Sequence, residues 1–170
     1  MKTVNSKLRT LSSAQWTAGS TPPAPVPGFI ISSFSALAAD VADRCLAERY
    51  GTAPAPAERG ERTAVLLVSP GGDRGTAQAV AELVDNGGRL SPLLFFQSVP
   101  NSIAGRITAH WGLTGPVVCT SPAGDPFEDA AELAELLVAD GDADEVLVLV
   151  VEQTPAGESE RATAVLLGAV

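Results

Sequence analysis

The sequence is poor in the side chains that most often carry catalysis or bind metals. Its 170 residues include one histidine, two cysteines and only 5% aromatic residues. The two cysteines, Cys45 and Cys119, lie in apolar surroundings without metal-ligand spacing, which predicts reduced, inert thiols and neither a disulfide nor a zinc site. We expect no metal and no cofactor, and a core packed mainly by alanine, valine and leucine.

Basic residues are also scarce. Eleven lysines and arginines stand against 20 aspartates and glutamates, which gives a formal net charge of −9 and an isoelectric point near 4.5. Such a surface repels phosphate backbones and anionic lipid, so nucleic acid and membrane surfaces are excluded as expected partners. No apolar run reaches membrane-spanning length, and the start MKTVNSKLRT has no apolar signal-peptide region. We therefore expect a cytoplasmic protein.

What the chain does contain is a regular alternation of apolar runs and amphipathic segments, with 45% hydrophobic residues. The expected strands are 63–68, 117–121, 145–151 and 162–170, and the expected helices are 33–50, 74–86, 101–111 and 125–141, with 93–96 either a strand or a lead-in to a helix. We expect 1–32 to be an irregular lead-in and 51–62 a Pro-rich loop. This order predicts one α/β domain over 1–170 with a mostly parallel sheet. The last two strands are joined only by the turn TPAGESER, so they should pair antiparallel.

The polar motifs favour structural roles over catalysis. His110 stands beside Trp111 on a predicted helix, with no carboxylate or cysteine at triad or ligand spacing. Residues 69–76 (SPGGDRGT) join a strand to a helix but lack both G-x-G-x-x-G and the Lys-Ser/Thr of a phosphate loop. Glu152 and Gln153 end an apolar strand, where parallel sheets place ligand crevices, and they remain candidate binding residues.

Three consecutive segments of the second half together form one succession of helix, Gly-Pro, strand, tight turn, helix and strand. They read SVPNSIAGRITAHWGLTGP, VVCTSPAG and PFEDAAELAELLVADGDADEVLVLVVEQ. This block resembles the N-terminal half of β-ketoacyl synthases, the condensing enzymes of the thiolase superfamily. The upstream segment TAVLLVSPGGDRGTAQAVAELV looks most like ketosynthase-like domains found beside aryl-polyene and type II polyketide genes. The resemblance implies a thiolase-like half with a mostly parallel five-stranded sheet, an antiparallel edge hairpin and helices on both faces.

The resemblance also implies the loss of catalysis. With Gly115-Pro116 and Ala123 in register, Gly124 occupies the position of the family's nucleophilic cysteine. Glycine has no side chain, and the neighbouring Asp125 opposes thiolate formation. The family's two catalytic histidines and its lysine belong to a C-terminal half to which no segment here corresponds. We therefore expect no catalytic residue.

Chain-length factors are relatives without the nucleophile that pair with an active ketosynthase and shape its acyl tunnel. By resemblance we expect a non-catalytic subunit of an active β-ketoacyl synthase, or of a ketosynthase/chain-length-factor pair, in bacterial type II polyketide or fatty-acid-type biosynthesis. It would scaffold that enzyme or shape its tunnel as an obligate oligomer. Acyl carrier proteins are acidic, so any carrier contact should be indirect.

The residues expected at the interface belong to an edge strand that pairs across a two-fold axis and to the preceding helix. They are Val117, Val118, Cys119, Thr120 and Ser121, with Asn101, Ile103, Ile107 and Trp111. The expected vestigial acyl pocket comprises Gln97, Gly124, Phe127 and Glu152.

Two alternatives stay open. One is an acyl-transfer or hydrolytic enzyme that uses Ser98, Ser121 or His110, although the sequence has no G-x-S-x-G elbow. The other is an acyl-binding or regulatory module that holds a ligand in the vestigial pocket.

Overall fold

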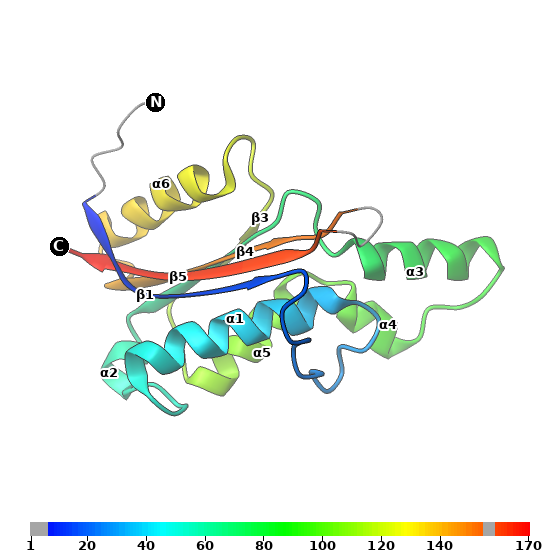
Figure 1. The fold of residues 1–170 in the computed structure, drawn as a ribbon, viewed down its shortest axis with the longest axis horizontal. Helices are drawn as coiled ribbons and strands as arrows, with labels where there is room; N and C mark the ends of the chain where they lie inside the picture. Colours follow the sequence, from blue (N-terminus) through cyan, green and yellow to red (C-terminus); the bar gives the residue numbers. More distant parts are fainter. Residues whose placement is uncertain (1–6, 155–158) are drawn as a thin grey trace.

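A central sheet organises the chain in a computed structural model that describes residues 7–154 and 159–170 (Figure 1). The strands are β1 (Leu8–Thr17), β2 (Thr63–Val68), β3 (Val117–Thr120), β4 (Glu145–Glu152) and β5 (Arg161–Ala169), in the spatial order β1-β5-β4-β2-β3. β2 is parallel to β3 and β4, whereas β5 is antiparallel to β4 and to β1. The expected α/β fold is thus confirmed, and the sheet is parallel over β4, β2 and β3 but antiparallel over β1, β5 and β4.

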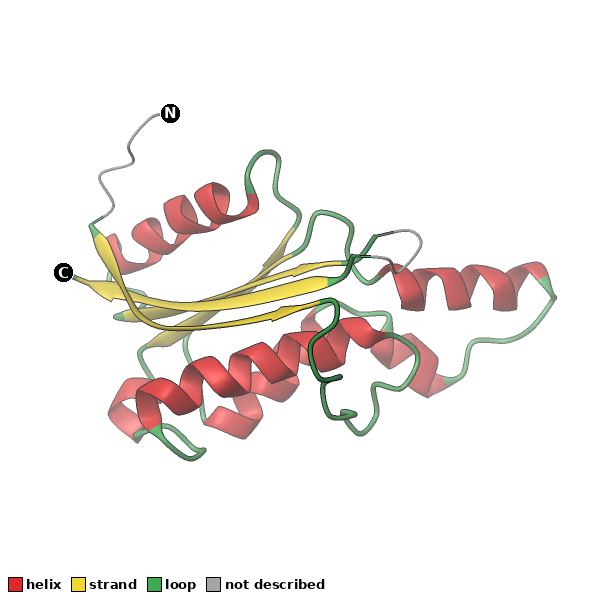
Figure 2. Ribbon diagram, viewed as in Figure 1, coloured by secondary structure: helices red, strands yellow, loops and turns green. Residues whose placement is uncertain are grey.

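Helices cover both faces of this sheet, as expected (Figure 2). They are α1 (Ser33–Tyr50), α2 (Ala57–Gly60), α3 (Arg74–Asp85), α4 (Pro92–Gln97), α5 (Asn101–Trp111) and α6 (Pro126–Ala139). In the view of Figure 1, α1, α2 and α5 lie below the sheet and α6 lies above it, while α3 projects beyond its end. Among the described residues, no helix combines the length and apolar character needed to cross a membrane.

The core has two layers because β2 and β4 are buried on both sides. The lower layer packs α1 and α5 against the sheet through residues such as Leu37, Ile103 and Leu147. The upper layer is thinner and rests on small residues of α6, including Ala130 and Ala134. Uninterrupted apolar strands of this kind are typical of parallel sheets that are covered on both faces.

The prediction of an irregular lead-in over 1–32 was wrong, because residues 8–17 form β1. The segment LRTLSSAQWT is largely polar, and it lies at the sheet edge with much of its surface exposed, so it shows no apolar run. β1 covers the outer side of β5, and the expected antiparallel hairpin is therefore not at the edge. The first six residues of the predicted lead-in, and residues 155–158 of the predicted turn, lie outside the described residues.

Smaller boundaries also differ from expectation. Residues 93–96 belong to α4, since Ser91 caps its first turn and Pro92 occupies the first helical position. The expected loop 51–62 contains the single turn α2. By contrast, α1 has the predicted bounds 33–50, and its cap is Ser32, whose hydroxyl accepts a hydrogen bond from the Phe34 amide. Asp125 and Pro126 begin α6 as predicted.

Candidate functional site

The carboxyl ends of β2 and β3 open into a cavity of about 400 Å³. Its walls come from the ends of these strands, the loop 69–73 that precedes α3, and the first turns of α1 and α5. The lining residues are Phe34, Leu67, Ser69, Pro70, Gly71, Gly72, Asp73, Pro100, Cys119, Thr120 and Ser121. Crevices in this position are the usual ligand sites of parallel sheets. We call this cavity the strand-end crevice.

Ser69 gives the strand-end crevice its one unusual polar group. The residue is 7% exposed, and its hydroxyl oxygen has no hydrogen-bond partner among the described residues. An unpaired buried hydroxyl costs about 1–3 kcal/mol, so such a group marks a place where another molecule can complete the bonding. Nearby Cys119 is half-buried, and burial raises the pKa of its thiol. An un-ionised thiol agrees with the predicted inert role.

The turn at the expected nucleophile position is occupied by carboxylates. Asp129 accepts hydrogen bonds from the amides of Ala123 (2.8 Å) and Gly124 (3.1 Å). Asp125 accepts from the amides of Phe127 (2.9 Å) and Glu128 (3.0 Å). The donors that would stabilise a thiolate or an oxyanion at this helix start are therefore already engaged by negative groups.

Gly124 is not required by packing. A Cβ at this position would meet only the Asp129 carboxylate, at 3.4 Å, which is an ordinary contact. Gly115 is different, because a Cβ there would clash with the backbone of Thr63. The Gly-Pro motif before β3 thus has a steric reason, whereas the glycine at position 124 has none.

The structure does not bring the four residues of the predicted vestigial pocket together. Gln97 is buried and ties α4 to the lead-in, since its Oε1 accepts from the amides of Ile30 (2.8 Å) and Ile31 (3.1 Å). It lines a separate cavity of about 270 Å³. Glu152 is paired with Arg161 and lines a third cavity.

Gly124 and Phe127 are not among the lining residues of the strand-end crevice or of those two cavities. The four residues therefore do not line one common cavity, and the cavity at the carboxyl ends of β2 and β3 is lined by other residues.

The predicted interface is also changed in part. Ile103, Ile107 and Trp111 are buried in the chain's own lower core and are not available at its surface. Their side chains face β2 and α1 because they form the apolar stripe of α5. Asn101 remains exposed at the start of α5.

The predicted edge strand is at the sheet edge. β3 is the last strand of the sheet and pairs on one side only, with β2. Val117 is 39% exposed, whereas Val118, Cys119 and Thr120 are half-buried. Ser121 follows the strand and donates a hydrogen bond to the carbonyl of Pro70 (3.3 Å).

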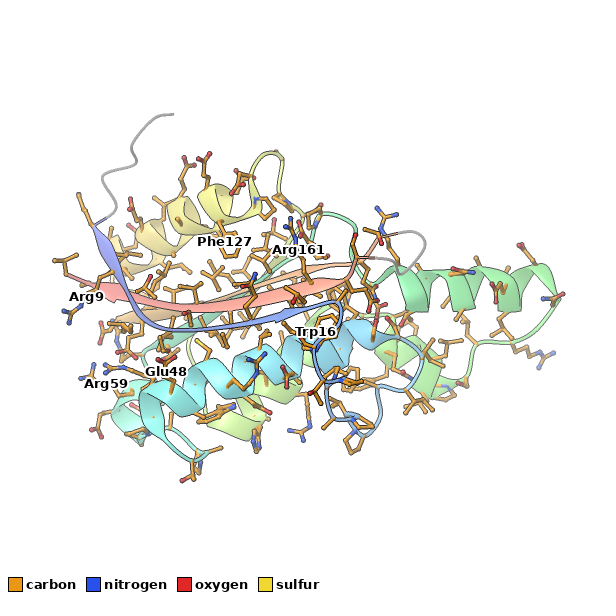
Figure 3. The ribbon with its side chains drawn as sticks, viewed as in Figure 1. Arg9, Trp16, Glu48, Arg59, Phe127 and Arg161 are labelled. Atoms are coloured by element: carbon orange, nitrogen blue, oxygen red, sulfur yellow. The ribbon has the colours of Figure 1, made fainter. Side chains whose placement is uncertain are left out.

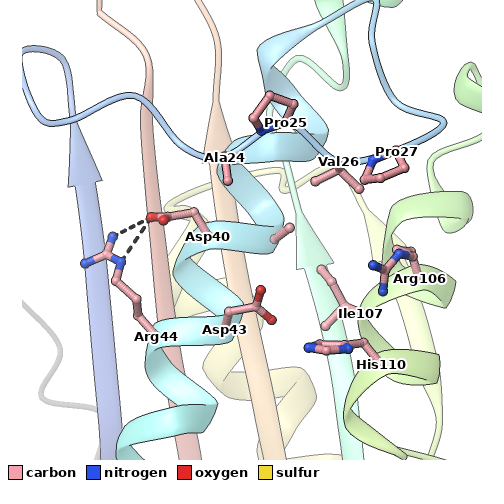
Figure 4. A pocket seen from close by; sticks show the side chains of 11 residues that line it. Ala24, Pro25, Val26, Pro27, Asp40, Asp43, Arg44, Arg106, Ile107 and His110 are labelled. Atoms are coloured by element: carbon pink, nitrogen blue, oxygen red, sulfur yellow. Dashed lines mark hydrogen bonds and ion pairs between the residues drawn. The ribbon is translucent and has the colours of Figure 1, made fainter. Parts of the chain in front are cut away.

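The three residues of the alternative enzyme hypothesis lie in three different places. Ser121 lines the strand-end crevice, Ser98 lines the cavity near Gln97, and His110 lines a cavity between α1 and α5 (Figure 4). The Ser98 hydroxyl donates to the carbonyl of Phe95 (2.7 Å). The described residues thus include no serine paired with a histidine base.

A large exposed apolar surface escaped the sequence analysis. It comprises α3, α4 and their connection (residues 74–99), which project from one end of the fold (Figures 1 and 3). Its exposed apolar side chains include Val84, Leu90, Leu93, Phe95 (63% exposed), Phe96 and Val99, and Ile30 and Ile31 adjoin it. We call this surface the apolar arm. Its signal in the sequence is the run PLLFF, which forms most of α4 and leaves Leu93, Phe95 and Phe96 exposed.

The comparisons agree on the kind of fold. Residues 31–163 match a family model described as the N-terminal domain of β-ketoacyl synthases. No curated protein matches the chain.

Three of the similar solved structures are ketosynthase proteins. The first is the ketosynthase ApeO in complex with its chain length factor ApeC from Xenorhabdus doucetiae, with a TM-score of 0.63 and 22% identity. The match covers 82% of this chain and 58% of that one. The ishigamide ketosynthase/chain length factor has a TM-score of 0.69 and 19% identity, with coverages of 85% and 49%. A β-ketoacyl synthase from Burkholderia phymatum has a TM-score of 0.66 and 18% identity, with coverages of 87% and 48%. The chain thus spans about half the length of these proteins and shares their fold.

Proposed function

This chain belongs to the family of β-ketoacyl synthase N-terminal domains, and on that premise we propose that it is a non-catalytic ketosynthase-like subunit. It associates with an active β-ketoacyl synthase, or with a ketosynthase/chain-length-factor pair, in cytoplasmic type II polyketide or fatty-acid-type biosynthesis. The observation that carries the proposal is Gly124 in its carboxylate-bound turn. The site has neither the thiol nor the free donors that acyl transfer requires.

The apolar arm and the open side of β3 support the association. Burying apolar surface contributes about 25 cal/mol per Å², and contiguous exposed apolar patches mark association sites. An unpaired strand edge offers backbone donors and acceptors to a partner strand. Two of the similar solved structures contain ketosynthases together with chain length factors, which makes a ketosynthase-type subunit the favoured partner.

The role in the complex follows from charge. A net charge of −9 disfavours direct docking of an acidic acyl carrier protein. The subunit therefore scaffolds its partner or shapes the acyl tunnel, and carrier contact is indirect.

Co-expression tests the proposal. The tagged chain, co-expressed with ketosynthase and chain-length-factor subunits from the same genome, is expected to co-purify with them and to change product length. Leu93→Glu with Phe95→Glu, which charges the apolar arm, is expected to abolish co-purification. Leu136→Glu is the matched control, because Leu136 is equally exposed but lies on α6.

Two results contradict the proposal. One is the absence of any complex with the unaltered chain. The other is condensation of carrier-bound acyl substrates by this chain alone.

Ser69 favours a second candidate function, an acyl-binding module whose ligand occupies the strand-end crevice. Native mass spectrometry of the purified chain would then show a bound acyl species. Ser121→Trp places a ring at the mouth of the crevice and should remove that species, whereas Ser98→Trp, in a different cavity, should retain it.

A further inference from the structure

A small cavity between α1 and α5 carries charged groups that the proposed ketosynthase role does not use (Figure 4). Its volume is about 210 Å³. α1 supplies Asp40 and Asp43, and α5 supplies Arg106 and His110. Residues 24–27 close one end with apolar and proline side chains. α1 also supplies Arg44, so its wall carries two carboxylates and one guanidinium, whereas the wall from α5 carries no carboxylate.

One charged pair in the cavity is already satisfied. The Arg44 guanidinium donates to Asp40 Oδ2 through Nε (3.0 Å) and through a terminal nitrogen (2.8 Å). The same terminal nitrogen reaches the backbone carbonyl of Gln15 (2.9 Å). Asp40 and Arg44 neutralise one another and contribute no free charge.

Asp43 is only partly engaged. Its Oδ1 accepts a hydrogen bond from the Trp111 indole N–H (2.7 Å), which positions the carboxylate at the cavity. No described residue donates to its Oδ2. The neutral indole leaves the full negative charge of Asp43 uncompensated.

Arg106 and His110 face Asp43 from one turn apart on α5 (Figure 4). Both residues are exposed, whereas Asp43 is half-buried. Neither Arg106 nor His110 forms a hydrogen bond or an ion pair with a described residue, and the His110 ring packs edge-on against Trp111. Among the described residues, no ion pair joins Arg106 to Asp43. The cavity therefore separates a free cation from a free anion, with an imidazole beside the cation.

We propose that this cavity binds a small amino carboxylate, a molecule with a carboxylate and an ammonium group a few bonds apart. The ligand carboxylate accepts from the planar donor fork of Arg106 and from an imidazole N–H of His110. The ligand ammonium donates to Asp43 Oδ2. Val26 and Ile107 contact the carbon chain between the two groups.

The size of the cavity restricts the ligand further. The cavity volume is about 210 Å³, against about 400 Å³ for the strand-end crevice. The smaller volume favours a compact ligand. A ligand with a single charge contacts only one of the two walls, so it gains fewer charge-assisted hydrogen bonds and binds more weakly.

His110 is the only histidine in the sequence, so its ring-proton signals in NMR spectra report on this cavity alone. The unaltered chain is titrated with glycine, β-alanine and γ-aminobutyrate, and with acetate and methylammonium as singly charged probes. We expect saturable shifts of the His110 signals with at least one amino carboxylate. Acetate and methylammonium should bind at least about tenfold more weakly.

The variants locate the two charged contacts. Arg106→Gln and Asp43→Asn should each weaken binding of the best amino carboxylate by at least about tenfold. Asp43→Asn retains an oxygen acceptor for Trp111, and thermal unfolding of each variant checks that the fold is intact. Arg89→Gln, an exposed substitution on the distant apolar arm, should leave binding unchanged.

Three outcomes overturn the proposal. The first is no saturable shift with any amino carboxylate. The second is acetate binding as tightly as the amino carboxylates, which identifies a simple anion site. The third is binding that survives both Arg106→Gln and Asp43→Asn. All three outcomes leave the proposed ketosynthase association intact, because the apolar arm lies elsewhere.

Discussion

At the scale of single residues, Gly124 has room for a side chain but lies beside the negatively charged carboxylate of Asp129. The Asp129 carboxylate is 3.4 Å from the position of an added Cβ, and a nearby negative charge disfavours a thiolate. We expect Gly124→Cys to react with iodoacetamide near neutral pH no faster than an ordinary exposed cysteine. Gly124→Cys with Asp129→Asn should react about three to ten times faster.

Asparagine is the matched replacement because its side-chain oxygen can still accept from the amides of Ala123 and Gly124. Peptide mass spectrometry separates the new thiol from Cys45 and Cys119. Equal alkylation rates in the single and double variants, or condensing activity in Gly124→Cys, would contradict this account of the turn.

At the scale of secondary-structure elements, the end of α1 is joined to the start of β4 by a partly buried cluster around the buried Glu145. The Tyr50 hydroxyl donates to Glu145, and Arg49 pairs with the same carboxylate at 2.7 Å. Burial, and secondarily the bond to Glu145, raises the pKa of Tyr50 from 10.0 to about 12. The neutral hydroxyl is therefore favoured by folding, and this contribution to stability is present below pH 10 and is lost as the pH rises toward 12.

Tyr50 is the only tyrosine in the sequence, so tyrosinate absorbance follows this group directly. The absorbance midpoint of the folded chain should lie well above that of the unfolded chain. Tyr50→Phe should lower the free energy of unfolding by about 1–2 kcal/mol at neutral pH, and it should flatten the fall in stability between pH 10 and 12. An ordinary midpoint for Tyr50 in the folded chain would refute the cluster's role.

At the scale of the whole molecule, the apolar arm leaves the isolated chain incomplete. Large aliphatic and aromatic side chains from α3 to Val99 are exposed together, which favours association in water. We expect the unaltered chain without its partner to form dimers or larger species in size-exclusion chromatography with light scattering. Leu93→Glu with Phe95→Glu should shift it to a 17.4 kDa monomer, and Leu136→Glu should not. A monodisperse monomer of the unaltered chain at all concentrations would contradict this prediction.

Prediction from sequence succeeded where the signal is local. The helices 33–50, 101–111 and 125–141 followed from apolar spacing and caps, and β2 and β4 followed from uninterrupted apolar runs. It failed for β1, because an exposed edge strand carries polar residues and gains its stability from hydrogen bonds to β5, about 150 residues later in the chain.

The candidate site was likewise predictable only where its features are local in the sequence. The glycine at position 124 is visible in the sequence, and so are the acidic residues of the turn around it. The hydrogen-bond partners of the polar side chains are not visible in the sequence. Gln97, for example, accepts from the amide of Ile30, 67 residues away, and therefore does not line the expected pocket. Likewise, the burial of Ile103 and Trp111 in the chain's own core depends on how α5 packs against the sheet.

The sequence by itself determined the fold class, the family likeness, the acidic surface and the missing nucleophile, because these depend on composition, periodicity and local motifs. Only the tertiary structure decided which apolar surface stays uncovered, which polar groups stay unpaired, and where the cavities lie. Those properties are set by contacts between segments far apart in the chain. The apolar arm, the free hydroxyl of Ser69 and the opposed charges of Asp43 and Arg106 are therefore found only in three dimensions.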